Sequence, residues 1–270
     1  MRRVVLVLAT MALAILLAGG AAQAIINGEP DRGPKAHSYV GALVTVPSSG
    51  EFKGQRIPLC SGTLISARVF LSAGHCTEFL IEEGLPTYVS LDPTYKPGAS
   101  QVIKAIPYTH PKFCNAAKEG CPRYDAGVVV LKEPVRRASY GALPDAGPAD
   151  TLKEGQRLTA VGYGATGYQI GGGPRPQPVY PGDRNRATVR LLDTNDPAIG
   201  EMFLKTTGVS LTGGKGASSC HGDSGGPLFM PNQRTIVGVT SFGIAPLCRG
   251  PGYYHSVDLP RVLKWVRSFP

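Results

Sequence analysis

Several patterns are missing from this sequence of 270 residues, and each absence argues against a class of protein. The six cysteines include no C-x-x-C pair, which argues against a zinc knuckle. The 28 lysines and arginines are scattered singly rather than gathered in basic runs with interleaved aromatics, so the formal charge of +9 does not indicate specific nucleic-acid binding. No repeat of fixed period is present. We therefore expect no metal, no cofactor and no nucleic-acid partner.

Long hydrophobic runs are also absent, except at the N-terminus. Two arginines precede VVLVLATMALAILLA, and the small-residue triplet Ala-Gln-Ala ends at Ala24. This is the pattern of a secretory signal peptide, so we expect cleavage of residues 1–24 and export of a monomer without stable membrane association. An uncleaved anchor is the alternative, because residues 4–26 just reach the length of a bilayer span, but the Gly-Gly break before the triplet favours cleavage.

Helical patterning is scarce and turn residues are abundant. The 35 glycines and 24 prolines make up about a fifth of the chain, nearly twice ordinary usage. Ten short apolar or alternating runs recur between them, and this spacing predicts an all-β sandwich or barrel. The runs cover residues 39–46, 62–73, 87–91, 100–106, 126–131, 156–164, 186–192, 226–230, 235–243 and 252–257.

Two segments differ from these strand patterns. Residues 258–269 have apolar side chains at helical spacing, with Asp258 as an N-cap, and predict a helix at the end of the chain. Residues 167–186 contain too many glycines and prolines to pack and predict a long exposed loop. Near residues 143–150 the chain divides into halves with similar numbers of strands.

Three polar residues are candidates for nucleophilic catalysis. Ser224 is flanked by Gly-Asp and Gly-Gly in SSCHGDSGGPLF, a setting that suits a tight turn exposing its hydroxyl. A serine needs a base to accept its proton, and His75 in SAGHC is the first candidate. Asp125 in RYDAGVVVL precedes an apolar strand, where a carboxylate can fix the tautomer of an imidazole. Each residue alone has an ordinary structural explanation; the combination indicates a hydrolase.

Five ordered segments together resemble the trypsin and chymotrypsin family of serine endopeptidases. They are LCSGTLISARVFLSAGHC, YDAGVVVL, SSCHGDSGGPLF, VTSFG and PGYYHSV, in the family's order of His, Asp and Ser. The match extends from residue 25 to the last helix. The resemblance implies two six-stranded Greek-key β-barrels, at approximately 25–142 and 143–257, with the active site between them and a C-terminal helix in 258–270.

The resemblance also implies a role for each matching residue. Ser224 attacks the peptide carbonyl, His75 acts as general base and then general acid, and Asp125 orients the imidazole. The backbone N–H groups of Gly222 and Ser224 form the oxyanion hole. The segment that pairs with substrate as an added strand consists of Ser241, Phe242 and Gly243, with Phe242 where the family usually has Trp.

Disulfide pairing is open from the sequence alone, because six cysteines in an exported chain allow fifteen sets of three bonds. The resemblance implies Cys60–Cys76 beside the histidine and Cys220–Cys248 beside the specificity pocket. Cys114 and Cys121 are then left to pair locally, before Asp125, which is less usual in the family.

Ser218 lies six residues before the nucleophile, at the position of the pocket floor, where trypsin-like members carry an acid. Without that acid, a substrate Lys or Arg would bury an unpaired charge. Gly243 and Gly252, on the implied pocket walls, leave room for a large ring. We therefore expect a chymotrypsin-like preference for Tyr, Phe and Leu before the scissile bond.

Other interpretations remain open. An elastase-like preference for small residues follows if Ile244, Ala245 or Leu247 folds across the pocket entrance. A catalytically inactive family member that binds a partner is a second alternative, and a basic surface adhesin is a third. His221 contacts substrate or is a solvated rim residue, and the remaining histidines at 37, 110 and 255 are expected to have packing or surface roles.

The segment Ile-Ile-Asn-Gly from Ile25 resembles the Ile-Val-Gly-Gly N-terminus of active family members. In them the new ammonium group pairs with the aspartate before the nucleophile, here Asp223. Because no propeptide separates Ala24 from Ile25, we expect signal peptidase itself to activate the enzyme. Cleavage after Ala22 with later trimming is the alternative.

Overall fold

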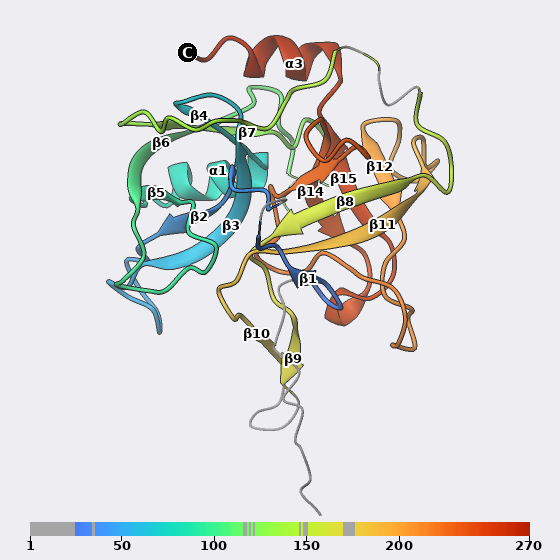
Figure 1. Ribbon diagram of the computed structural model, residues 1–270, viewed down its shortest axis with the longest axis horizontal. Coiled ribbons are helices and arrows are strands. Elements are labelled where there is room, and N and C mark those ends of the chain that lie inside the picture. Colours follow the sequence, from blue (N-terminus) through green and yellow to red (C-terminus); the bar gives the residue numbers. More distant parts are fainter. Residues whose placement is uncertain are drawn as a thin grey trace, which may run out of the picture.

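The computed structural model describes residues 25–270 apart from 34–35, 116–117, 119, 121, 146, 148–150 and 170–175. Two closed antiparallel β-barrels lie side by side (Figure 1). The first has the strand order β2-β3-β4-β7-β6-β5, a Greek-key arrangement in which β4 pairs with β7. Its strands are β2 (Val40–Thr45), β3 (Ile57–Leu64), β4 (Val69–Ser72), β5 (Thr87–Ser90), β6 (Ile103–Thr109) and β7 (Gly127–Leu131).

The second barrel has the strand order β8-β11-β12-β15-β14-β13 and closes because β8 pairs with both β11 and β13. Its strands are β8 (Arg157–Gly162), β11 (Asn185–Asp193), β12 (Phe203–Thr206), β13 (Pro227–Phe229), β14 (Ile236–Gly243) and β15 (Gly252–Ser256). A short strand, β1 (Glu29–Pro30), pairs with β11, so the start of the described part of the chain lies on the second barrel. The predicted fold of two six-stranded barrels is confirmed.

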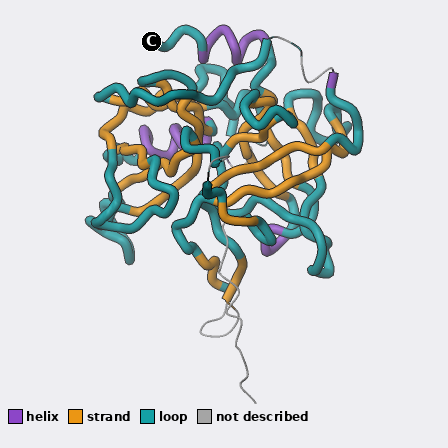
Figure 2. Tube along the Cα trace, in the orientation of Figure 1, coloured by secondary structure: helices purple, strands orange, loops and turns teal. Residues whose placement is uncertain are grey.

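Helices are few and short in the part of the chain that the structure describes (Figure 2). They are α1 (Gly74–Glu82), a 3-10 turn η2 (Pro246–Cys248) and α3 (Pro260–Val266). None of the described helices has the length and apolar character needed to cross a membrane. Helix α3 packs back onto the first barrel, where the ring of Phe269 beyond it lies 5.1 Å from that of Tyr108 on β6.

The structure corrects several local predictions. The run 62–73 is two strands, β3 and β4, separated by residues 65–68. The loop expected at 167–186 contains a small hairpin of β9 (Gly167–Gln169) and β10 (Gln177–Val179), with residues 170–175 outside the described part. Helix α3 begins after Leu259, which is its N-cap, while Asp258 accepts a hydrogen bond from Ser256. Besides this hairpin, the sequence did not predict α1, β12, β1 or η2.

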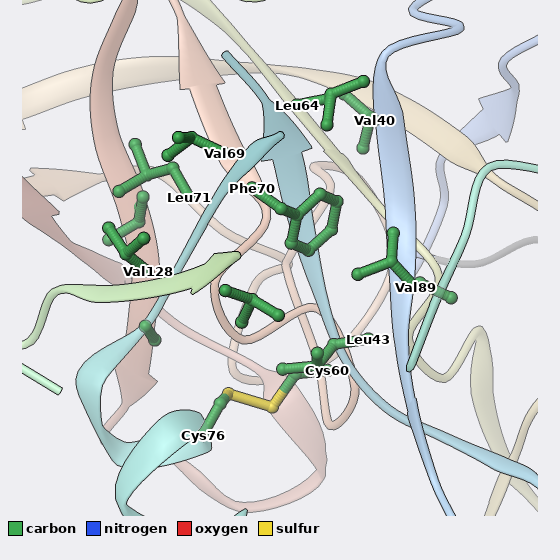
Figure 3. Packing of buried hydrophobic residues seen from close by; sticks show 14 of the residues in the cluster. Val40, Leu43, Cys60, Leu64, Val69, Phe70, Leu71, Cys76, Val89 and Val128 are labelled. Atoms are coloured by element: carbon green, nitrogen blue, oxygen red, sulfur yellow. A yellow bond between two sulfur atoms is a disulfide. The ribbon is translucent and has the colours of Figure 1, made fainter. Parts of the chain in front are cut away.

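Phe70 fills the centre of the first barrel, among the apolar side chains of Figure 3. Two glycines on neighbouring strands make room for its ring, because a Cβ on Gly62 would lie 2.3 Å from Phe70 Cε1 and one on Gly41 3.2 Å from Phe70 Cε2. The Cys60–Cys76 disulfide joins β3 to α1 at the edge of this core. The barrel thereby fixes the first turn of α1, which carries His75.

A buried ionic cluster joins the N-terminal segment to the second barrel. Asp31 accepts hydrogen bonds from Arg184 Nε at 2.7 Å and from His37 at 2.8 Å through its backbone N–H, and its Oδ1 lies 2.9 Å from His37 Nδ1. Burial alone would raise the pKa of Asp31, but His37 and Arg184 outweigh it and hold the pKa below its usual value. Removing one partner from such a cluster is expected to be costly, since a buried charge is left uncompensated.

Candidate active site

A cleft of about 660 Å³ is lined by residues of both barrels. The first barrel contributes His75, on the first turn of α1, and Asp125, just before β7. The second barrel contributes Gly222 and Ser224, from the turn before β13, and Ser241 of β14. The structure therefore brings the three predicted catalytic side chains to one cleft.

His75 and Asp125 are paired through two kinds of donor. The imidazole Nδ1 lies 2.9 Å from Asp125 Oδ2 and 3.2 Å from Oδ1, and the backbone N–H of His75 donates to Oδ1 at 2.8 Å. The hydroxyl of Ser241 also donates to Asp125 Oδ2. Since Nδ1 is engaged by the carboxylate, the other ring nitrogen, Nε2, remains free to accept or donate a proton in the cleft.

Burial and pairing act in opposite directions on these two groups. Burial alone would raise the pKa of Asp125, but the charge and hydrogen bonds of His75 and the hydroxyl of Ser241 hold it well below its usual range. Burial alone would lower the pKa of His75, but the charge and hydrogen bond of Asp125 raise it above its ordinary value. An ionised aspartate beside a histidine of increased basicity is the arrangement that general-base catalysis requires.

The turn that carries Ser224 depends on glycine. Gly222 and Gly225 have φ angles of +91° and +77°, which side chains rarely adopt. A Cβ on Gly225 would lie 2.1 Å from the hydroxyl oxygen of Ser72. Ser61 holds the turn in place by donating its backbone N–H to Ser224 O and its hydroxyl to Gly222 O, both at 2.8 Å. Within the described residues, the N–H groups of Gly222 and Ser224 make no hydrogen bond.

Asp223, between those two residues, is 1% exposed. Its carboxylate accepts the backbone N–H groups of Gly164 and Cys220, each at 2.8 Å. No ion pair to Asp223 is formed by any residue in the described ranges, and burial raises its pKa to about 7. A Cβ on Gly164 would lie 2.5 Å from Asp223 Cγ, so backbone surrounds the carboxylate closely.

The N-terminal segment is inserted into the second barrel. Ile25 is fully buried in its core cluster. The next residue, Ile26, exchanges backbone hydrogen bonds with Ser218, at 2.9 and 3.2 Å. Ser218 is two residues before Cys220, whose N–H binds Asp223. A short run of backbone therefore connects the start of the described chain with the buried carboxylate.

The residues predicted to form the specificity pocket lie outside the lining of the 660 Å³ cleft. Ser218 is 4% exposed, and its hydroxyl accepts the N–H of Val209 at 2.6 Å. A Cβ on Gly252 would lie 3.4 to 3.5 Å from Tyr254, Thr206 and the Ser219 hydroxyl, whereas one on Gly243 would meet nothing closer than 3.9 Å. Gly252 thus lies beside Ser219, next to the predicted floor, and the space around Gly243 is open.

Two of the predicted disulfides are present, Cys60–Cys76 and Cys220–Cys248. The third prediction, Cys114–Cys121, involves Cys121, which lies outside the described residues. Within the described ranges, one group of side chains has the spacing of a metal site: Cys60, His75 and Cys76. Because both cysteines are in a disulfide, they offer no thiolate to a metal.

Sequence reasoning missed part of the cleft. The hydroxyl of Ser241 was expected only on a substrate-pairing strand, yet it donates to Asp125. Tyr180, from the segment predicted to be an exposed loop, lines the cleft together with His221. The outer face of α1 adds a charged rim in which Lys118 Nζ lies 3.1 Å from Glu78 Oε2 and also contacts Glu82. The four-residue spacing of these two glutamates is the sequence signal for that rim.

Comparison with known proteins matches this geometry to one family. The Trypsin family model matches residues 37–266. Trypsin of Saccharopolyspora erythraea is 30% identical over 239 residues, which cover 84% of this chain and 89% of that protein. Kallikrein-8 of Homo sapiens is 28% identical over 227 residues, covering 80% and 78% respectively.

Solved structures agree at the level of the fold. A mouse neuropsin structure, described as a serine protease expressed in the limbic system of the brain, gives a TM-score of 0.65 at 23% identity and covers 90% of this chain and 99% of its own. A structure of HL collagenase gives a TM-score of 0.67 at 20% identity, with coverage of 90% and 97%. The family match covers most of the chain and both barrels; this protein belongs to the trypsin family and is a serine endopeptidase acting on protein or peptide substrates.

Proposed function

We propose that Ser224, His75 and Asp125 form a catalytic triad. The observation that carries this proposal is the pairing of His75 Nδ1 with Asp125 Oδ2 at 2.9 Å, in the same cleft as Ser224. The pairing selects the tautomer with a proton on Nδ1, which leaves the lone pair of Nε2 to accept the serine proton. The raised pKa of His75 increases the basicity of that lone pair.

The reaction follows in two halves. Ser224 Oγ attacks the carbonyl carbon of the scissile bond as His75 takes its proton, and a tetrahedral intermediate forms. His75 then gives that proton to the leaving amine, the C–N bond breaks, and an acyl-enzyme remains on Ser224. Water repeats the sequence and releases the acid. Asp125 stays ionised throughout and stabilises the imidazolium.

The oxyanion of each tetrahedral intermediate would be bound by the N–H groups of Gly222 and Ser224. Both are free of protein acceptors within the described residues, and both residues line the cleft. One such donor typically contributes about 3 kcal/mol of transition-state stabilisation. Ser241, Phe242 and Gly243 would pair with the substrate backbone as an added strand.

The preferred residue before the scissile bond is proposed to be large and apolar or aromatic: Tyr, Phe or Leu. The floor position carries Ser218, whose hydroxyl is already engaged by Val209, so no carboxylate is supplied there for a substrate Lys or Arg. Open space around Gly243 supports room for a ring. The competing proposal is a preference for small residues, which would follow if the exposed side chain of Ile244, next to Gly243, covered the pocket entrance.

Maturation is proposed to occur on export, by signal cleavage between Ala24 and Ile25. The new ammonium group of Ile25 would pair with Asp223, a buried carboxylate with two backbone donors and no cation among the described residues. Support comes from the complete burial of Ile25 and from the backbone pairing of Ile26 with Ser218. Such a pair is worth about 3 to 5 kcal/mol against loss of one partner.

The triad is tested with Ser224→Ala, and with Ser49→Ala as a control on an exposed serine. The mature protein is treated with a serine-directed fluorophosphonate and assayed on matched Tyr and Ala peptide esters. Ser224→Ala should lose labelling and about 10⁶-fold in turnover, while Ser49→Ala behaves as wild type. Peptidase activity retained in Ser224→Ala would refute the assignment, and an Ala ester preferred by about tenfold would refute the aromatic preference.

A further inference from the structure

A histidine is buried on β15, on the side of the second barrel that faces the first. His255 is 0% exposed, and its ring stands edge-on to Phe203 of β12 at 5.4 Å. Its cross-strand partner on β14 is Val239, which belongs to the same apolar cluster as the core of the first barrel. Tyr254, the preceding residue, belongs to the core of the second barrel instead. Alternation along the strand therefore turns His255 toward the first barrel.

Both ring nitrogens of His255 lack a hydrogen-bond partner among the described residues. A neutral imidazole has one N–H donor and one acceptor nitrogen, and burying either without a partner costs about 1 to 3 kcal/mol. Buried polar atoms are seldom left in this state, and those that are require an explanation. An aromatic ring at this position would pack against Phe203 without the cost, so packing alone does not account for a histidine.

The electrostatic surroundings keep this ring neutral. Burial lowers the pKa of His255 to about 4, and the charge of His110 acts in the same direction. The negative charge of Asp125 opposes them without restoring the ordinary pKa. Asp125 and His110, both from the first barrel, are the titratable groups whose charges reach His255.

Asp125 already receives hydrogen bonds from both barrels, and His255 is not among the donors. The two oxygens of Asp125 offer about four lone-pair sites, and three donors occupy them: the backbone N–H of His75, its imidazole Nδ1, and the hydroxyl of Ser241. Ser241 lies on β14 only two residues beyond Val239, the cross-strand partner of His255. The histidine is therefore on the strand next to the one that already supports the carboxylate from behind.

We propose that His255 is a positioning residue of this protease: as a neutral, buried imidazole on the strand beside β14, it acts on Asp125 through space with its N–H dipole, without a direct hydrogen bond, and so helps to hold His75 in its catalytic state. The proposal rests on the triad assigned above. His255 touches neither the substrate nor the reacting atoms and acts only through Asp125. Loss of the N–H leaves more of the negative charge of Asp125 to His75, which should raise the pKa of His75.

The test compares His255→Phe, which keeps a ring and removes the N–H, with His255→Gln, which keeps an N–H donor. Phe203→Leu is the matched packing control, since it disturbs the ring contact without touching a polar group. For each mature enzyme, kcat/KM on a Tyr peptide ester is measured from pH 4.5 to 9 and normalised to active sites counted with the fluorophosphonate.

His255→Phe should move the acid limb of kcat/KM to higher pH by about half a unit and lower kcat/KM near pH 6 several-fold. His255→Gln should restore the wild-type limb, and Phe203→Leu should lower Tm without moving it. An unmoved limb in His255→Phe, or an equal shift in Phe203→Leu, would overturn the proposal. If the triad assignment itself were wrong, Ser224→Ala would stay active, which none of these three variants reports.

If His255→Phe does not fold, nitrogen-15 NMR of the wild-type enzyme gives the answer. A ring N–H of His255 should be protected from exchange, remain neutral from pH 5 to 9, and change its resonance in Asp125→Asn. A rapidly exchanging N–H, titration near the ordinary histidine pKa of about 6.5, or no response to Asp125→Asn would overturn the proposal.

Discussion

Asp125 and Asp223 are two carboxylates buried to almost the same extent, at 4% and 1% exposure, and the protein satisfies them in opposite ways. Asp125 has an imidazole, a backbone N–H and a hydroxyl, and its pKa is held well below the usual range. Asp223 has two backbone N–H groups and, among the described residues, no cation, so burial raises its pKa to about 7. Burial is common to both; the presence of a charged partner decides the protonation state.

The difference supports our proposal that the part of the site in the second barrel depends on N-terminal processing. In the first barrel, the Cys60–Cys76 disulfide holds the helix turn that carries His75, and β7 holds the segment that carries its partner Asp125. The second barrel surrounds Asp223 closely with the backbone of Gly162 and Gly164, and no cation among the described residues pairs with it. A new N-terminal ammonium at Ile25 is the missing cation in our proposal. In this proposal Asp125 has its partners once the chain is folded, whereas Asp223 gains its cation only after cleavage.

Among changes at the two carboxylates and their partners, the largest effect is expected from Asp125→Asn. An amide is a weaker acceptor than a carboxylate for the Nδ1–H group of His75, and it favours the wrong imidazole tautomer. The value of kcat should therefore fall by about 10⁴-fold, as for triads of this type. The measurement is kcat at saturating Tyr ester, with folding checked by circular dichroism. Asp145→Asn, at an exposed site, is the control and should keep wild-type activity. A loss below tenfold in Asp125→Asn would show that this carboxylate does not orient the catalytic imidazole.

The second effect concerns Asp223. A chain carrying one extra residue before Ile25, and separately Asp223→Asn, should lose most fluorophosphonate labelling, because the proposed pair of about 3 to 5 kcal/mol no longer holds the oxyanion turn. Active-site titration of purified, folded protein measures it. Mature wild-type enzyme, with its N-terminus confirmed by sequencing, is the reference. Full labelling of the extended chain would rule out activation by the Ile25 amine.

The pH dependence of stability should differ between the extended and mature forms. In the extended chain the pKa of Asp223 is raised from 3.8 to about 7, so the folded state binds more protons than the unfolded state between those values, and stability is lost as pH rises through about 7. In the mature enzyme, pairing raises the α-amino pKa above about 7.7 to 8.0, so that contribution is complete below this range and lost as pH rises through the folded pKa. Tm measured from pH 5 to 10 should therefore begin to fall at lower pH for the extended chain.

Some features of the fold and the site could be predicted from the sequence, and others could not. An all-β fold and most of its strands were predictable, because alternating apolar runs and turn residues are local signals, whereas the two-barrel topology came only from the family resemblance. Helix α1 was not, since its N-cap residue Ala73 makes no side-chain cap bond and its first turn has no acid. The donor from Ser241 to Asp125 joins residues 116 apart in the chain, and the orphaned ring of His255 depends on three elements. Neither feature produces a local sequence pattern, so both could be found only in the three-dimensional structure.

A carboxylate introduced by substitution extends the comparison. Ser218→Asp would place an acid at the proposed pocket floor, in place of the hydroxyl that accepts the N–H of Val209. Cleavage after Tyr should fall by about tenfold to a hundredfold, since the charge is stranded when an aromatic ring fills the pocket. Ser218→Asn, which adds bulk without charge, is the control and should lose less. Unchanged Tyr cleavage in Ser218→Asp would show that residue 218 is not the floor.

The smallest effect is expected from the third donor to Asp125. Ser241→Ala removes the hydroxyl that binds Oδ2, while His75 keeps both of its contacts with the carboxylate. A hydrogen bond to a charged group is worth about 1.5 to 3 kcal/mol, and the remaining donors compensate in part, so kcat should fall by about tenfold rather than by the 10⁴-fold of Asp125→Asn. Ser241→Thr keeps the hydroxyl and suits a strand, and it should recover most of the loss. If Ser241→Thr were as slow as Ser241→Ala, the hydroxyl would not be the group that supports Asp125. His75 alone would then keep that carboxylate hydrogen-bonded and ionised.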